Sequence, residues 1–155
     1  MNTETTLDAF WRRCAARHGL TGPRPPLCAF GDSKSQQNEL ANLVVTGRKR
    51  ATAGLALWYG YDRETAPKPG DLHIFTDGSG TPRGIIRITE IREAPFNSVD
   101  DQFAHDEGEG DRSRAYWLAE HHRFFAAELA REGLAMADTV KVMFQRFEHL
   151  DCPDI

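Results

Sequence analysis

The segment Val44-Val45-Thr46-Gly47-Arg48-Lys49-Arg50-Ala51-Thr52-Ala53 changes from a helical to a strand-like pattern around a single glycine. Apolar residues before it recur at helical spacing, at positions 40, 43 and 44, and those after it alternate, at positions 53, 55 and 57. Gly47 is suited to the left-handed turn that closes a helix. Lys49 and Thr52 therefore lie where a helix passes into a sheet. Such a place can hold a reactive amine near a hydroxyl, although a solvent-exposed basic turn has the same spacing and short motifs also match by chance.

Apolar periodicity predicts the helices and strands of the rest of the chain. Helices are expected up to about residue 18, over about 35–46, over 99–105 and over about 113–132, and strands over about 51–59, 71–77, 82–92 and 139–147. Connectors rich in Pro, Gly, Asp and Ser separate the strands and favour tight turns. The expected fold class is α+β, with a small curled sheet or barrel of mainly antiparallel strands and helices packed around it.

Length indicates one main domain. A chain of 155 residues, of which 40% are hydrophobic, is sufficient for a single core. Residues 1–22 are expected to form a helix and a stiff connector rich in Gly and Pro. They are too few for an independent core, so we expect them to pack on the main domain.

Composition excludes several classes of protein. The net charge of −4 argues against a broad electrostatic binder of duplex DNA, although a local basic site can still hold a nucleotide or a short strand. No apolar run approaches the ~20 residues that span a membrane, and the first residues lack the pattern of a secretory signal. Cys14, Cys28 and Cys152 are odd in number and far apart, which predicts reduced thiols and a cytoplasmic location.

Lys49 and Thr52 form the first candidate site. A Thr hydroxyl attacks a carbonyl once a base removes its proton, and a neutral lysine can be that base. This role requires the pKa of Lys49 to fall well below its usual ~10.4, through burial or through neighbouring cations such as Arg48 and Arg50. Because Lys49 is charged and near a turn, we expect it to contribute little to the core.

The acidic segment Asp106-Glu107-Gly108-Glu109-Gly110-Asp111 is a second candidate. It is expected to be a loop just before a helix, where negative charge is favoured for structural reasons alone. Two functional interpretations stand beside that one. The acids could hold a divalent cation, or one glutamate could face Lys49 and Thr52 as an acid or base. The spacing does not match a calcium-binding EF-hand loop.

Other polar residues give weaker signals. Gly31-Asp32-Ser33 is similar to the nucleophile block of the GDSL esterases. That family also needs an Asp-x-x-His motif, and no aspartate of this sequence has a histidine three residues after it. We therefore interpret Asp32 and Ser33 as a turn that starts a helix. Trp58, Tyr59 and Tyr61 end a predicted strand and could stack on a base.

The histidines indicate no metal site. His121 and His122 are adjacent, so they point to different faces of the predicted helix and do not form an i, i+4 pair. Only His105, next to Asp106, lies beside a candidate site, and the others are expected to be ordinary core or surface residues.

Four sequence blocks together resemble the ASCH domain family. They are Phe30-Gly31-Asp32-Ser33, Gly47-x-Lys49-x-x-Thr52, Lys68-x-Gly70-Asp71 and the segment from Glu107 to Ser113 before a Tyr-Trp helix. The resemblance covers about residues 27–149, which define the expected ASCH domain. It implies a PUA-like fold, a small β-barrel ringed by helices with a cleft between them.

The resemblance also implies work on RNA or its nucleosides. Some members are amidohydrolases that remove acyl groups from N(4)-acetylcytidine with a Lys, a Thr and a Glu, which correspond here to Lys49, Thr52 and Glu109, with Glu107 the second choice. Other members cleave single-stranded RNA, with or without a metal. Amide hydrolysis is therefore the first hypothesis, an RNA-cleaving or RNA-binding domain the second, and a non-enzymatic nucleotide sensor the third.

The first hypothesis assigns a role to each residue. Thr52 attacks the amide carbonyl, Lys49 takes the proton, and Glu109 orients Lys49 or protonates the departing amine. The expected partner is a nucleoside or a short single-stranded RNA, with no membrane, no duplex DNA, no cofactor and no metal. The residues expected to bind the substrate are Asp32, Ser33, Arg48, Arg50, Trp58, Glu107, Arg112 and Ser113.

Overall fold

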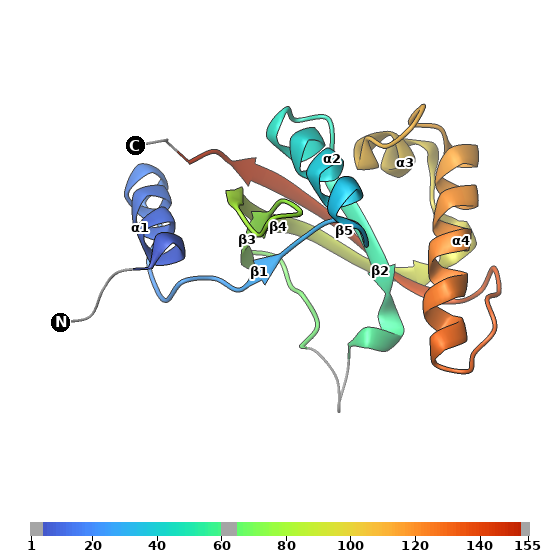
Figure 1. Cartoon of the computed structure of the whole chain (residues 1–155). Coiled ribbons are helices and arrows are strands. Elements are labelled where there is room, and N and C mark those ends of the chain that lie inside the picture. Colours follow the sequence, from blue (N-terminus) through green and yellow to red (C-terminus); the bar gives the residue numbers. More distant parts are fainter. Residues whose placement is uncertain (1–4, 60–64, 153–155) are drawn as a thin grey trace.

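A five-stranded sheet forms the centre of the molecule in the computed structural model, which describes residues 5–59 and 65–152 (Figure 1). The strand order is β1-β3-β4-β5-β2. β1 pairs with β3 in parallel, and every other pair is antiparallel. The strands are β1 Leu27–Cys28, β2 Ala51–Leu55, β3 Leu72–Thr76, β4 Pro82–Pro95 and β5 Lys141–Leu150.

Four α-helices surround the sheet, and each begins at a residue whose side chain accepts a hydrogen bond from the first turn. These N-cap residues are Thr5, Ser33, Asp100 and Ser113. The helices are α1 Thr6–His18, α2 Lys34–Val45, α3 Asp101–Glu107 and α4 Arg114–Arg131, and two short 3₁₀ turns are η1 Ala56–Trp58 and η2 Phe96–Ser98.

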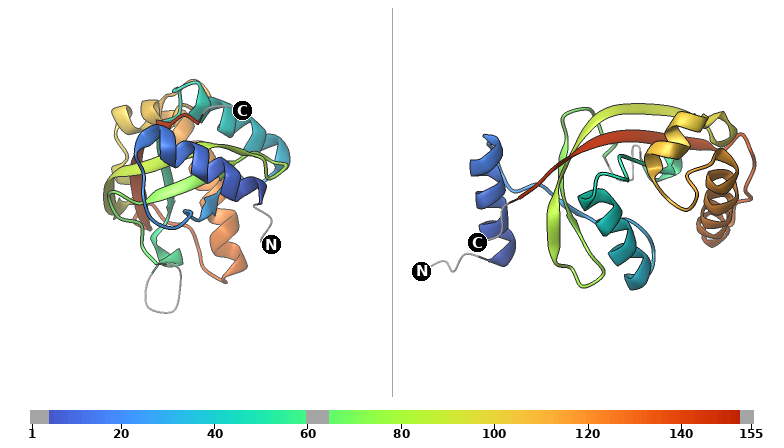
Figure 2. Two further views of the ribbon diagram at one scale, coloured as in Figure 1. Left: turned by 90° about the vertical axis from the view of Figure 1, so that its left-hand side faces the viewer. Right: turned by 90° about the horizontal axis from the view of Figure 1, so that it is seen from above.

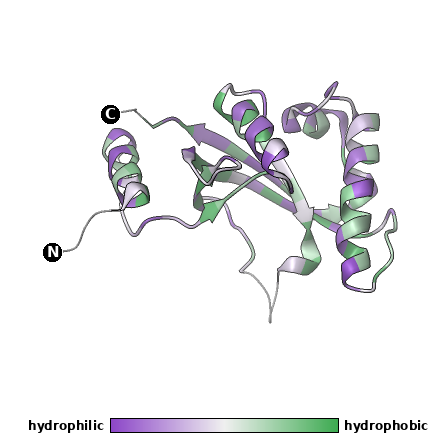
Figure 3. Ribbon diagram, viewed as in Figure 1, coloured by the Kyte–Doolittle hydropathy of each residue, from purple (hydrophilic) through white to green (hydrophobic). Residues whose placement is uncertain are grey.

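Helices cover the sheet on different sides. Successive residues of a strand point to opposite faces, so Ile74 of β3 packs with Phe10 and Cys14 of α1, while Phe75 packs with Leu40 and other residues of α2. α1 and α4 lie at opposite ends of the long β4–β5 ribbon (Figure 2). Hydrophilic and hydrophobic residues alternate around both helices, as is typical of helices with one buried side (Figure 3).

The α+β class and the mainly antiparallel pairing expected from the sequence are confirmed, but the sheet is not closed into a barrel. β1 and β2 are its two free edges. The strand expected over 51–59 ends at Leu55, because η1 follows and carries Trp58 out of the sheet. The acidic segment is also not a loop throughout, since Asp106 and Glu107 form the last turn of α3. Tyr61 lies outside the described residues.

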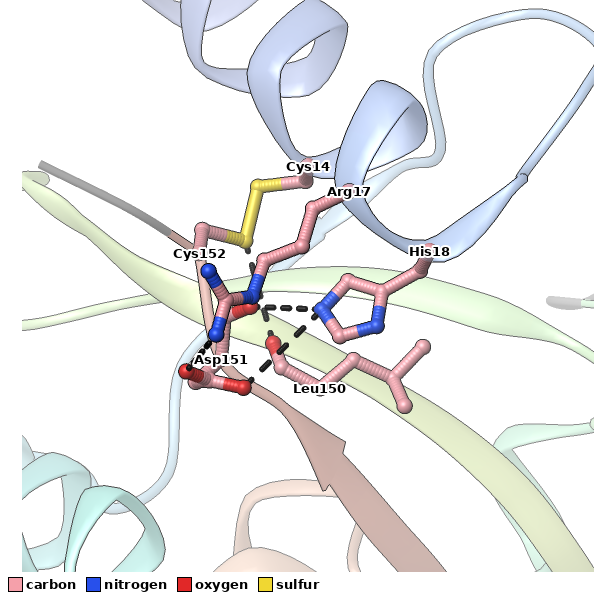
Figure 4. Close-up of a disulfide and its surroundings, with 6 residues drawn as sticks. All are labelled: Cys14, Arg17, His18, Leu150, Asp151 and Cys152. Atoms are coloured by element: carbon pink, nitrogen blue, oxygen red, sulfur yellow. Dashed lines mark hydrogen bonds and ion pairs between the residues drawn. A yellow bond between two sulfur atoms is a disulfide. The ribbon is translucent and has the colours of Figure 1, made fainter. Parts of the chain in front are cut away.

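A disulfide joins Cys14 of α1 to Cys152, so the expectation of three reduced thiols was wrong (Figure 4). The two cysteines are 138 residues apart in the sequence, so no local pattern indicates that they pair. The fold brings them together because the end of β5 passes beside α1. Arg17 forms an ion pair with Asp151 at 3.3 Å at the same place. Cys28 remains a thiol, and burial raises its pKa to about 12. Within the described ranges, no helix combines the length and the apolar character needed to cross a membrane.

Replacing Cys152 by Ser should destabilise the oxidised protein. A crosslink that closes a long loop restricts the unfolded chain, and its loss typically costs about 2–4 kcal/mol. Chemical denaturation of the variant and of wild type, each with and without dithiothreitol, checks this. The reduced wild type should match the variant, whereas equal stability of oxidised wild type and variant would show that the bond does not form or does not stabilise.

Candidate active site

The turn after α2 places Lys49 inside the protein. Gly47 takes a positive φ of 82° directly after the helix, as the sequence predicted. The backbone N–H of Lys49 then donates to the carbonyl of Leu43 at 3.0 Å, and that of Arg50 donates to the carbonyl of Asp106 at 2.7 Å. These bonds direct the Lys49 side chain between α2, α3 and β2, where its exposed fraction is 2%. The expectation of a minor role in the core was therefore wrong.

The Lys49 ammonium contacts two carboxylates. Its Nζ donates to Glu107 Oε1 at 2.7 Å, to Glu109 Oε2 at 3.1 Å and to the carbonyl of Ala51 at 2.9 Å. Burial alone would lower the pKa of Lys49, but the charges of Glu107 and Glu109 outweigh it and raise the pKa. Lys49 is thus an ammonium ion at neutral pH, and the expectation of a neutral lysine base was wrong.

Glu107 is the anchor of the cluster. Its side chain is 2% exposed, and its oxygens accept hydrogen bonds from Lys49 and from Trp117 Nε1. His121 Nε2 lies 3.1 Å from Glu107 Oε2. Burial would raise the pKa of this carboxyl, but the positive charges of Lys49 and His121 hold it well below its usual range. Glu107 is therefore a carboxylate at neutral pH.

Glu109 differs from Glu107 in both exposure and pKa. Its side chain is 15% exposed and lies two residues beyond α3, after the positive-φ residue Gly108. Burial and the nearby Glu107 charge raise its pKa, although Lys49 acts in the opposite direction. A partly exposed carboxyl with a raised pKa can exchange protons with a bound molecule, which Glu107 cannot do.

His121 is the residue of the cluster that sequence reasoning missed. Its ring stacks on that of Trp117 with 4.0 Å between centroids, and its Nδ1 lies 2.9 Å from the Trp117 carbonyl. Burial would lower the pKa of His121, but the Glu107 carboxylate outweighs it and the pKa is raised. The sequence carried a signal, because His121 lies four residues after Trp117 and four before Phe125, on the apolar side of the predicted helix, where a buried histidine needs a polar partner.

A cavity of about 220 Å³ opens beside the cluster. Lys49, Thr52, Glu109 and His121 line it, together with Gln36, Glu120 and apolar residues such as Phe30. Thr52 comes from β2 at the free edge of the sheet, and its hydroxyl makes no hydrogen bond within the described part of the chain. The structure thus brings Lys49, Thr52 and Glu109 to one cavity, which we call the reaction cavity.

The remaining predicted site residues lie outside the reaction cavity, and their role in substrate binding stays a prediction. Three arginines fasten the turn and α3 together. Arg48 donates to the Gly108 carbonyl at 2.7 Å, Arg50 to Asp106 at 2.9 Å and Arg112 to the His105 carbonyl at 2.9 Å.

The other predicted residues hold helix ends or contact α4. The Ser33 and Ser113 hydroxyls accept from the first turns of α2 and α4, and the Asp32 N–H donates to Gln36 at 2.9 Å. Trp58 Nε1 donates to Glu128 of α4 at 2.6 Å.

Three groups could act together as metal ligands. Ligand atoms of Glu107, Glu109 and His121 lie within 4.8 Å of one another. However, the Lys49 ammonium is already 2.7 Å and 3.1 Å from the two carboxylates. A divalent cation at this place would meet that positive charge, and the sequence expectation was a site without metal.

Replacing Glu107 by Gln should destabilise the folded protein, because it removes the carboxylate that the buried Lys49 and His121 cations share. Breaking a buried pair costs about 3–5 kcal/mol, which urea denaturation at pH 7 measures. The lowered Glu107 pKa contributes stability above pH 4.5 that is lost as the pH falls below it. The loss of folding stability between neutral and acid pH should therefore be smaller in the variant than in wild type.

Histidine titration by NMR gives a second check of the same variant. The pKa of His121 should lie above 6.5 in wild type and fall in Glu107→Gln. A His121 pKa that the substitution leaves unchanged would contradict the assigned pairing. Glu93→Gln is the matched control, since Glu93 is exposed on β4.

Comparison with known proteins places this chain in a family. The family model described as the ASCH domain matches residues 26–151. A crystal structure of an ASCH domain from Lactobacillus crispatus is 27% identical, with a TM-score of 0.85 and 93% of each chain covered. A crystal structure of a protein from Enterococcus faecalis is 37% identical, with a TM-score of 0.85, and the match covers 94% of this chain and 88% of that one. A search among curated proteins gave no match. The match over most of the chain shows that this protein belongs to the ASCH domain family.

Proposed function

We propose that this protein hydrolyses the amide bond of an acylated nucleoside of the N(4)-acetylcytidine type. The observation that supports this most is the shared lining of the reaction cavity by Lys49, Thr52 and Glu109, the residues to which the family resemblance assigns the chemistry. A cation, a hydroxyl with no hydrogen-bond partner among the described residues and a carboxyl with a raised pKa are groups that acyl transfer can use.

The first step forms an ester on the protein. The Thr52 hydroxyl attacks the acyl carbon, and its proton passes to the Glu109 carboxylate. The Lys49 ammonium stabilises the oxyanion, since its raised pKa suits it to electrostatic stabilisation and not to proton abstraction. When the C–N bond breaks, Glu109 returns the proton to the departing cytosine amine.

The second step releases the acid. Water attacks the ester carbon, Glu109 takes its proton, and the C–O bond to Thr52 breaks with return of a proton to the hydroxyl. Glu107 keeps Lys49 in place throughout, because it is ionised and fully buried. His121 and Trp117 hold Glu107 in turn.

Cleavage of single-stranded RNA is the second candidate. The Glu107, Glu109 and His121 cluster favours it, because such groups bind divalent cations. Two observations favour amide hydrolysis instead. Lys49 already neutralises the carboxylates, and it is the only Lys or Arg among the described residues that line the reaction cavity.

Thr52→Ala and Glu109→Gln should each lower kcat for N(4)-acetylcytidine at least ~100-fold, because they remove the nucleophile and the proton carrier. Chromatographic measurement of cytidine release checks this. Asp111→Asn is the matched control in the same acidic segment, since Asp111 is exposed and accepts a hydrogen bond from the Ser113 N–H just before α4. A variant of Thr52 or Glu109 that kept wild-type turnover would refute the mechanism.

The pH profile and metal dependence give an independent test. Glu109 must be ionised to accept a proton, so kcat/KM should rise with pH through a pKa above the usual 4.5. The raised Lys49 pKa keeps the ammonium form until above pH 10.5, so no loss is expected near neutrality. EDTA should leave the rate unchanged. Loss of activity in EDTA with recovery in Mn²⁺ or Mg²⁺ would support the RNA-cleaving alternative.

A further inference from the structure

A second and larger cavity, of about 680 Å³, lies next to the reaction cavity. Both are lined by Ala29, Phe30, Thr52 and Ala53, so they meet at the proposed nucleophile. Residues of both β1 and β2 line the second cavity. These two strands are the free edges of the curled sheet (Figure 1). Its volume is in the range of sites that enclose a small molecule.

The strand register places the polar groups of this cavity in a defined order. Thr52 of β2 is opposite Gln145 of β5, and His73 of β3 is opposite Ile86 of β4. Opposite residues in a paired strand share a face of the sheet, and all four residues line the second cavity. Gln145 is therefore the neighbour of Thr52, while His73 lies farther across the sheet, on the strand beyond β4.

Two of these polar groups have no hydrogen-bond partner among the residues that the structure describes. Gln145 is 8% exposed, and its amide makes no hydrogen bond within the described ranges. The Nδ1 atom of His73 is buried and likewise has no partner among the described residues. Buried polar groups are nearly always hydrogen-bonded, so His73 Nδ1 indicates a bound polar molecule or water. The Gln145 amide lines the same cavity and can bind the same molecule.

The charged residues that line the second cavity indicate what charge its ligand carries. Asp71 is the only ionic side chain among the described residues that line the second cavity, and no Lys or Arg is among them. Asp71 is half-buried and forms an ion pair with Lys68 at 3.3 Å. Phosphate groups require cationic or N–H donors for binding, so this cavity favours an uncharged molecule.

We propose that the second cavity binds the ring and the sugar of a neutral nucleoside whose acyl group lies in the reaction cavity. This inference rests on the proposed function and adds the residues that select the substrate. Gln145, next to Thr52, hydrogen-bonds the polar edge of the pyrimidine ring. His73 hydrogen-bonds a sugar hydroxyl. The protein then acts on free nucleosides in preference to nucleotides or RNA.

Binding of the nucleoside product, cytidine, tests the inference without requiring catalysis. Calorimetric titration of wild type with cytidine, cytosine and cytidine 5′-monophosphate should give the tightest binding for cytidine. Gln145→Leu should weaken binding of both cytidine and cytosine about 3- to 10-fold, as expected for one lost hydrogen bond. His73→Phe should weaken cytidine more than cytosine and so lower their affinity ratio by a similar factor. His105→Phe is the matched control, since His105 is exposed and lies outside both cavities.

Each outcome decides one claim. Cytidine binding that neither Gln145→Leu nor His73→Phe weakens, or no cytidine binding at millimolar concentration, overturns the assignment of the second cavity. Equal or tighter binding of the monophosphate overturns the preference for an uncharged nucleoside. If cytidine binds as expected but N(4)-acetylcytidine is not hydrolysed, the proposed function fails while the binding site stands.

Discussion

The Lys49 ammonium, enclosed by Glu107 and Glu109, is the interaction on which the rest of the structure depends. A buried charge is tolerated only when opposite charges and hydrogen bonds replace water. Here the replacement groups come from separate elements: Lys49 follows α2, Glu107 ends α3, Glu109 follows it, and His121 belongs to α4. Because the four groups neutralise one another only when these elements meet, the cluster fixes how the helices sit on the open sheet.

Interactions around the cluster hold the same elements from outside. Asp106 accepts hydrogen bonds from Arg50 and Arg146, which ties the end of α3 to β5. Arg48 donates to the Gly108 carbonyl, and a Cβ on Gly108 would lie 2.4 Å from the Arg48 carbonyl oxygen. The arginines around Lys49 are thus structural cations in the described structure. Lys49 is therefore the only Lys or Arg among the described residues that line the reaction cavity, which favours a neutral substrate over a polyanion.

The incomplete closure of the sheet provides the space for function. β1 is only two residues long and pairs on one side, and β2 is the opposite edge. A closed barrel would fill the gap between them with backbone hydrogen bonds. The open gap instead leaves two adjoining cavities that share Thr52, one with the charged cluster and one with the polar side chains of Gln145 and His73. Chemistry and selection are therefore proposed to occupy neighbouring parts of one groove.

Local sequence determined much of this protein, because helix caps, turn glycines and apolar periodicity act within a few residues. The helix before Gly47, the long helix from about 113 to 132, the antiparallel strands and the family blocks were all predictable in this way. Only the tertiary structure decided the protonation state of Lys49, since a pKa depends on charges that folding brings near, and the sequence showed only the flanking arginines. The same applies to the partner of Cys14, to His121 beside Glu107 and to Gln145 beside Thr52. These contacts join residues far apart in the chain, and no local propensity encodes them.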